Sequence, residues 1–127
     1  MQPTFAPAIA ERFEWVSTLD EGNYDELKTE QQRVTEYLQQ QLDERDVLVI
    51  PTTASIAPRK NASIKEVEAI RTKTMQLTCI AGLSGFPQIT VPVLRKDGLA
   101  LGLSFIANQG RDRSLLNFVD TYFGGAK

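Results

Sequence analysis

Apolar residues recur at helical spacing through the first third of the chain. The first set predicts a helix from Pro7 toward Leu19. Its apolar residues are Phe5, Ile9, Phe13 and Val16. Residues 20–23 are polar and contain a glycine, which predicts a break. A second apolar stripe among Lys, Glu and Gln residues then predicts an amphipathic helix over Tyr24–Leu42. Its members are Tyr24, Leu27, Val34, Leu38 and Leu42.

The middle of the chain predicts a strand and a capped helix. Asp46–Pro51 is a continuous apolar run rich in β-branched residues, the pattern of a strand covered on both faces in a parallel or mixed sheet. Residues 52–61 predict a loop. Ser63 and Glu66 form a capping box, and the helix that they open is expected to end near Gly82. Its apolar side consists of Ile64, Val67, Ile70, Thr74, Leu77 and Ile80.

Two alternating segments predict a β-hairpin. In residues 88–94, Pro92 lacks an N–H and therefore marks a sheet edge, a bulge or a strand end. Lys96-Asp97-Gly98 has turn chemistry, because glycine adopts positive φ at little cost. In residues 99–107, large residues alternate with small ones. The small face of Ala100, Gly102 and Ser104 predicts the close approach of another backbone.

The chain closes with a helix that Asp112 is expected to cap and Gly124-Gly125 to end. The predicted order is therefore α-α-β-α-β-β-α, an α/β chain. We expect a single domain over residues 1–127. It would comprise a helical lead-in at 1–45 and a strand, helix, hairpin and helix at 46–127.

Composition excludes several classes of chemistry. The 127 residues carry 14 Lys+Arg and 16 Asp+Glu, a net charge of −2, which argues against nucleic-acid binding. There is no histidine for a Ser-His-Asp or Cys-His centre, and a single cysteine allows neither an internal disulfide nor a Cys/His zinc site. The single thiol and the absence of a secretory signal predict a cytoplasmic protein. The lack of an apolar run long enough to span a bilayer predicts no membrane contact. We expect neither a metal nor a cofactor.

Catalytic motifs are also missing. Gly82-Leu83-Ser84-Gly85 falls short of a nucleophile elbow, and no serine is followed by lysine three residues later. The acidic run Asp43–Asp46 is interpreted as a solvated turn rather than a metal site. Asn61-Ala62-Ser63 matches a glycosylation sequon but is interpreted as the lead into a helix cap. The residues alone predict no self-sufficient enzyme.

Four segments keep the order and spacing of a known family. They are Asp46–Thr53, Leu77–Pro92, Asp97–Ile106 and Asp112–Leu116. Together they resemble the C-terminal part of the amidase signature family. The resemblance implies an α-α-β-α-β-β-α fragment of that family's mixed-sheet fold, with a C-terminal β-hairpin and helix. Residues 3–42 are compatible with the branch that includes indole-3-acetamide hydrolases and their inactive chloroplast-import relatives.

The resemblance also implies a function. Family members hydrolyse amides with a Ser-cisSer-Lys triad in a Gly/Ser-rich segment upstream of the matched part, and no residue here corresponds to it. The chain is therefore expected to be the C-terminal segment of an amide hydrolase that cleaves the C–N bond of a small carboxamide, inactive when alone.

Five residues are candidates for the wall of the substrate pocket. Thr52 and Thr53 follow a strand at the end where open α/β sheets place ligand contacts. Met75, Thr78 and Cys79 lie along a helix that resembles one bordering the family's pocket. Met75 falls where the glutamine-using branch carries an acidic residue, and an uncharged thioether favours an apolar or aromatic amide instead. For Met75 and Cys79, plain core packing remains the favoured interpretation.

Two other hypotheses stay open. The chain would act as a stand-alone, non-catalytic interaction module derived from an amidase, or as a small enzyme sharing Lys60, Lys65 or Lys73 between copies of the chain. Solvated surface lysines are the default interpretation of the latter three. Because a sheet cut from a larger one exposes strand edges, we expect either a homo-oligomer or a triad-bearing amidase chain as partner.

Overall fold

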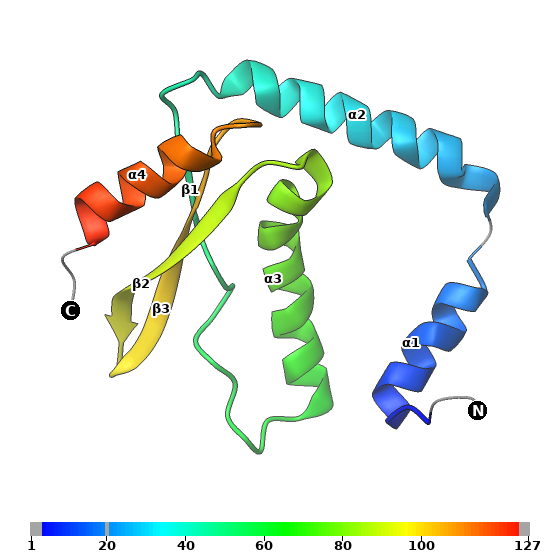
Figure 1. The fold of residues 1–127 in the computed structure, drawn as a ribbon. Helices are drawn as coiled ribbons and strands as arrows, with labels where there is room; N and C mark the ends of the chain where they lie inside the picture. Colours follow the sequence, from blue (N-terminus) through cyan, green and yellow to red (C-terminus); the bar gives the residue numbers. More distant parts are fainter. Residues whose placement is uncertain (1–3, 20, 125–127) are drawn as a thin grey trace. The chain divides into compact units, whose positions relative to one another are not determined.

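A computed structural model describes residues 4–19 and 21–124, and its elements follow the predicted order (Figure 1). They are α1 (Pro7–Ser17), the 3₁₀ turn η1 (Glu21–Asn23), α2 (Tyr24–Gln41), β1 (Leu48–Pro51), α3 (Ile64–Ser84), β2 (Gln88–Lys96), β3 (Leu99–Ile106) and α4 (Asp112–Phe123). The α/β prediction is confirmed, and η1 occupies the predicted break. Contacts divide the chain into two compact units, Met1–Glu30 and Gln31–Lys127. A single domain over 1–127 stays a prediction.

In the first unit, apolar residues of α1 and of the start of α2 are exposed. Helix α1 begins with Pro7, whose fixed φ suits the first helical position. The Phe5 ring stacks on Phe13 with centroids 4.7 Å apart. Ile9, Val16 and Leu27 are all exposed. Farther along the second stripe, within the second unit, Leu38 and Leu42 pack against the cluster that contains Ile50.

The second unit is organised around a three-stranded sheet in the order β1-β3-β2. Both neighbours of β3 run antiparallel to it, which corrects the expectation of a parallel or mixed sheet for the described residues. Strands β1 and β2 therefore run parallel to each other, as in a β-α-β crossover through α3. They do not pair because the hairpin strand β3 lies between them.

Helices α3 and α4 lie on opposite sides of this sheet (Figure 1). On the side called here the α3 face, Ile50 and Ile106 pack with Ala81 and Phe86. On the other, the α4 face, Phe105 and Ala107 pack with Leu115 and with half-buried residues of β2, β3 and α4. The core of the second unit is therefore two clusters separated by the strands.

Strand β1 is covered less completely than predicted. Ile50 is buried on the α3 face, but Val49 is 50% exposed on the α4 face. The contacts of α4 with the sheet are concentrated along β2. The expectation that Asp46–Pro51 is covered on both faces is wrong for this reason.

The start of α3 follows the prediction, and its end does not. The Ser63 N–H donates to Glu66 Oε2 at 2.9 Å, and the Glu66 N–H donates to Ser63 Oγ at 3.3 Å, which confirms the capping box. The helix continues past Gly82 to Ser84. Gly85, at φ 70°, ends it by donating its N–H to the Ala81 carbonyl at 2.9 Å.

The hairpin and the last helix refine three further predictions. Pro92 lies in a bulge of the edge strand β2, because the register shifts between Val91 and Leu94. Asp97 and Gly98 both have positive φ, as a two-residue hairpin turn requires. Asp112 is not a cap: Arg111 holds the N-cap position without a side-chain bond, and Asp112 is the first helical residue. Gly124 follows the helix as predicted, and Gly125 lies outside the described residues.

Candidate functional site

Polar side chains of the α3 face converge on one buried hydroxyl. Ser104 is 0% exposed, and its Oγ lies 2.9 Å from Thr52 Oγ1 and 3.0 Å from Thr90 Oγ1. The Gln88 side-chain amide donates to the same oxygen at 3.0 Å. We call these residues, Thr52, Gln88, Thr90 and Ser104, the hydroxyl cluster. Strand pairing builds it, because Ser104 is the direct partner of Thr90 in β2 and of Ile50 in β1.

The hydrogen bonds of the hydroxyl cluster fix the position of a strand end. A hydroxyl offers one proton and two lone pairs. Since Gln88 donates to Ser104, that serine donates to one threonine and accepts from the other. Its bonding capacity is then filled, and no basic side chain contacts it in the described structure. The cluster therefore holds the end of β1 against β3 and β2 rather than supplying a nucleophile.

Gly102 makes room for this arrangement. A Cβ at this position would lie 2.7 Å from Thr52 Oγ1 and 3.0 Å from Thr90 Cγ2. The sequence predicted the approach of another backbone to this small face. The structure corrects that expectation, because the atoms that approach belong to two threonine side chains.

Thr53 lies outside the hydroxyl cluster, in the loop that follows β1. Thr53 is exposed, and its hydroxyl donates to the Ser55 carbonyl at 2.7 Å. The next backbone N–H, of Ala54, donates to Thr74 Oγ1 of α3 at 3.2 Å. Thr52 thus joins the hydroxyl cluster while Thr53 does not. Thr74 was predicted only as part of an apolar stripe, but it ties this loop to the helix.

The three helical candidates have unequal surroundings. Thr78 is half-buried and donates to the Thr74 carbonyl at 3.1 Å. Met75 is 53% exposed, and Cys79 is exposed with a weak contact from Sγ to the Gln76 carbonyl at 3.5 Å. Core packing is therefore the wrong interpretation of Met75 and Cys79 in this chain. They lie four residues apart on one side of α3, while Leu77, Ile80 and Ala81 take the side that packs.

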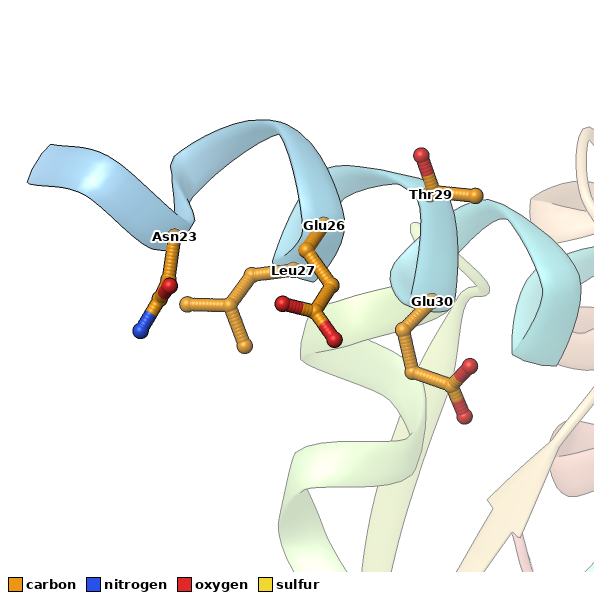
Figure 2. Close-up of a pocket in the computed structure, with 5 residues that line it drawn as sticks. All are labelled: Asn23, Glu26, Leu27, Thr29 and Glu30. Carbon is orange, nitrogen blue, oxygen red and sulfur yellow. The ribbon is translucent and has the colours of Figure 1, made fainter.

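Two hollows of the described surface differ in which candidates they include. One of about 440 Å³ lies between α2 and α3 and includes only Cys79 of the five; its walls are Arg33, Val34, Tyr37, Leu38, Cys79, Ile80 and Leu83. Another, of about 540 Å³, is lined by a single stretch within residues 23–30. Figure 2 shows its residues along one helical surface, with Thr29 pointing away from the others. Neither of these two hollows brings the sequence-predicted wall residues together.

Charged groups offer no alternative centre. In residues 4–19 and 21–124, no three acidic or cysteine side chains gather in a way that would hold a metal ion. The acidic run at 43–46 forms a turn in which the Asp46 carboxylate accepts from the Asp43 N–H at 2.9 Å. Lys60, Lys65 and Lys73 are exposed. Within the same described part of the chain, no helix is both long enough and apolar enough to cross a membrane.

Comparison with known proteins gives one consistent family. The family model described as Amidase matches residues 2–116. The chain is 32% identical over 121 residues to Amidase 1 of Arabidopsis thaliana, and the aligned part is 95% of this chain and 28% of that protein. Both matches therefore extend over nearly the whole of this chain.

One further relative and one solved structure are similar to this chain. A translocon protein of Pisum sativum, Translocon at the outer membrane of chloroplasts 64, is 31% identical over 123 residues, or 97% of this chain and 20% of that one. A crystal structure of an amidase superposes with a TM-score of 0.71 at 21% identity, over 90% of this chain and 27% of that chain. The chain thus shares the fold, and it spans less than a third of the length of these proteins.

Proposed function

The chain belongs to the amidase family, and on that premise we propose that it is the C-terminal segment of an amide hydrolase. In the complete enzyme this segment would support hydrolysis of the C–N bond of a small carboxamide. The observation that carries the proposal is the family match over residues 2–116, by a chain that spans only 28% of Amidase 1.

In this proposal, the segment supplies scaffold and the reactive atoms belong to the remainder of the domain. The Ser-cisSer-Lys triad implied by the family has no counterpart in this sequence. The hydroxyl cluster would fix the end of β1, and thereby the loop that carries Thr53. Support comes from the filled bonding capacity of Ser104 and the anchoring of Ala54 to Thr74.

The helix α3 would contribute to the wall of the substrate pocket. Met75 and Cys79 are exposed on one side of the helix, which leaves their sulfur-containing side chains available to the rest of the domain. A thioether does not pair with an ammonium group, so Met75 favours an apolar or aromatic carboxamide over glutamine. We further propose a cytoplasmic location and a triad-bearing amidase chain or a second copy of this chain as partner.

A chimaera tests this function. The segment of Arabidopsis Amidase 1 that aligns with this chain is replaced with it, and ammonia release is measured with a panel of aromatic and aliphatic carboxamides. We expect the chimaera to hydrolyse at least one amide and this chain alone to hydrolyse none at the same concentration. Turnover by the isolated chain, or a folded chimaera without any turnover, would overturn the proposal.

A second candidate function is a non-catalytic interaction module. It is favoured by the identity to the pea translocon protein and by the fact that the second unit has its own buried clusters. The same experiment separates the two candidates. A module predicts a stable, monodisperse chain and an inactive chimaera, whereas the hydrolase segment predicts an active chimaera.

A further inference from the structure

We propose that Thr74 is a positioning residue that sets the substrate preference of the amidase pocket, because it holds the loop after β1 against helix α3. This inference rests on the proposed function, in which Thr53 of that loop and Met75 and Thr78 of the helix belong to the pocket wall. The sequence placed Thr74 only in the apolar stripe of its helix. In the structure it is half-buried and binds a group outside the helix.

The Thr74 hydroxyl is used differently from other hydroxyls of α3. Those of Thr72, Thr78 and Ser84 each donate to the carbonyl four residues earlier in the same helix, at 2.9, 3.1 and 2.7 Å. Such bonds are local and hold nothing outside the helix. Thr74 Oγ1 instead accepts from the Ala54 N–H at 3.2 Å. Of these four hydroxyls, it is the one that reaches the loop.

Thr53 lies between two anchors of this loop. On one side, the Thr52 N–H donates to the Gly102 carbonyl at 2.9 Å, and the Thr52 hydroxyl belongs to the hydroxyl cluster. On the other side, Ala54 is bound to Thr74. Two residues span at most about 7 Å of chain, so fixing both ends leaves Thr53 little room to move. Removing the bond to Thr74 therefore frees one end of this short segment.

The same residue is joined to the helical part of the wall. The Thr74 carbonyl accepts from the Thr78 hydroxyl at 3.1 Å, and Met75 follows Thr74 directly in the helix. The helix therefore fixes the spacing from Thr74 to these two residues. The hydrogen bond to Ala54 then sets how far Thr53 lies from them. Thr74 fixes the shape of the wall in this way without touching the substrate.

A wall positioned by Thr74 affects substrate binding rather than the chemical step. In the proposed function the reacting atoms belong to the triad-bearing part of the domain, so a displaced wall weakens binding of the ground state and of the transition state equally. Such a loss raises KM and leaves kcat unchanged. Because the triad takes the amide group, the wall faces the substituent of the carboxamide. The effect should therefore grow with the size of that substituent.

Steady-state kinetics of the chimaera test this role with two probes, phenylacetamide and acetamide. Thr74→Val removes the hydroxyl and keeps the branched shape. We expect it to raise KM for phenylacetamide about fivefold or more, while kcat and the KM for acetamide change less than about twofold. Thr74→Ser keeps the hydroxyl and should restore the KM of the parent chimaera. Thr72→Val removes a hydroxyl that is bound within the helix, and this matched control should change neither constant.

Hydrogen exchange tests the bond itself in this chain alone. We expect the Ala54 amide to exchange about tenfold or more faster in Thr74→Val than in wild type or in Thr74→Ser. The Gly85 amide, which donates to the Ala81 carbonyl at the other end of α3, is the reference and should not change. Equal exchange of the Ala54 amide in wild type and in Thr74→Val would overturn the proposal.

The outcomes separate this role from the proposed function. A folded chimaera without turnover removes the hydrolase, and the comparison then uses the dissociation constant of phenylacetamide. Thr74→Val should raise that constant and Thr74→Ser should not; no binding, or one constant for all variants, would overturn the positioning role. An active chimaera with the same KM in all variants keeps the hydrolase and overturns the role. Equal rises in KM for both probes, or a loss confined to kcat, would do the same.

Discussion

The two faces of the sheet use the same three strands but are closed in different ways. On the α4 face, Phe105 lies 5.6 Å from Phe118 and 5.2 Å from Phe123, measured between ring centroids, in an apolar cluster. On the α3 face, the apolar contacts of Ile50 and Ile106 adjoin the hydroxyl cluster around Ser104. The first face is stabilised chiefly by buried area. The second also specifies the position of one strand end, because hydrogen bonds are directional.

The largest effect on stability is expected from removing a buried aromatic ring from the α4 face. Phe105→Ala removes a buried ring, and both the lost burial and the cavity should lower the free energy of unfolding by about 3–5 kcal/mol. Chemical denaturation measures the change. Phe105→Leu is the control and should cost clearly less. A loss below about 1 kcal/mol for Phe105→Ala would show that this face does not hold the second unit together.

A smaller effect is expected from removing the centre of the hydroxyl cluster. Ser104→Ala leaves Gln88 and two threonines without their shared partner, and should cost about 1–3 kcal/mol in the free energy of unfolding. Ser84→Ala is a matched control, because the Ser84 hydroxyl donates to the Ile80 carbonyl of its own helix at 2.7 Å. Its loss should be close to zero. Equal losses would mean that the cluster adds nothing beyond local bonding.

Substitutions at two glycines test the packing around the hydroxyl cluster. Gly102→Ala forces a methyl group toward Thr52 Oγ1 and should destabilise the chain by about 1–3 kcal/mol. Gly82→Ala, in the interior of α3 with no atom within 4 Å of its added Cβ, should stabilise it by about 0.5–1 kcal/mol. Opposite shifts in the denaturation midpoint are expected. Shifts of the same sign would contradict the proposed packing at Gly102.

The smallest effect concerns the start of α3, where the pH dependence has a definite sign. The backbone N–H and the hydroxyl of Ser63 bind the Glu66 carboxylate and lower its pKa from 4.5, against a weaker opposing effect of burial. A depressed pKa in the folded state means that the stabilisation is present at neutral pH and is lost as pH falls through the acid range below 4.5.

Denaturation at a series of pH values measures this loss against Glu66→Gln, which keeps an acceptor without a titrating charge. The stability difference between wild type and Glu66→Gln should be constant near neutrality and shrink in acid. Ser63→Ala should cost about 1 kcal/mol at pH 7. A difference that grows in acid would contradict the assigned direction of the Glu66 pKa.

Local signals predicted the elements but not all of their ends. The Ser63–Glu66 pair and the Asp97-Gly98 turn act within a few residues, and the structure confirms both. The prediction that α3 ends near Gly82 was wrong because a glycine can also lie inside a helix, and the left-handed residue that ends α3 is Gly85. Asp112 misled similarly, because an acidic residue suits both the cap and the first turn.

The candidate site shows the same limit. Thr52 was singled out as a candidate because it follows a strand end. Its hydrogen-bond partner Ser104, and Thr90 beside it, stood out in the sequence only as small or polar members of an alternating face. Ser104 lies 52 residues from Thr52 along the chain. No local sequence pattern predicts a contact between residues so far apart in the chain. Met75 and Cys79 show the converse, since apolar character predicted packing and the structure leaves both side chains exposed.

By itself, the sequence determined the order and type of the elements, the absence of histidine chemistry and the family resemblance, because periodicity, composition and local motifs are carried by neighbouring residues. Tertiary structure alone decided that β3 lies between β1 and β2, that a buried serine gathers hydroxyls from two strands, and that Val49 remains uncovered. These features depend on which segments meet in space. That choice is made by the total burial and hydrogen bonding of the packed chain rather than by any one segment.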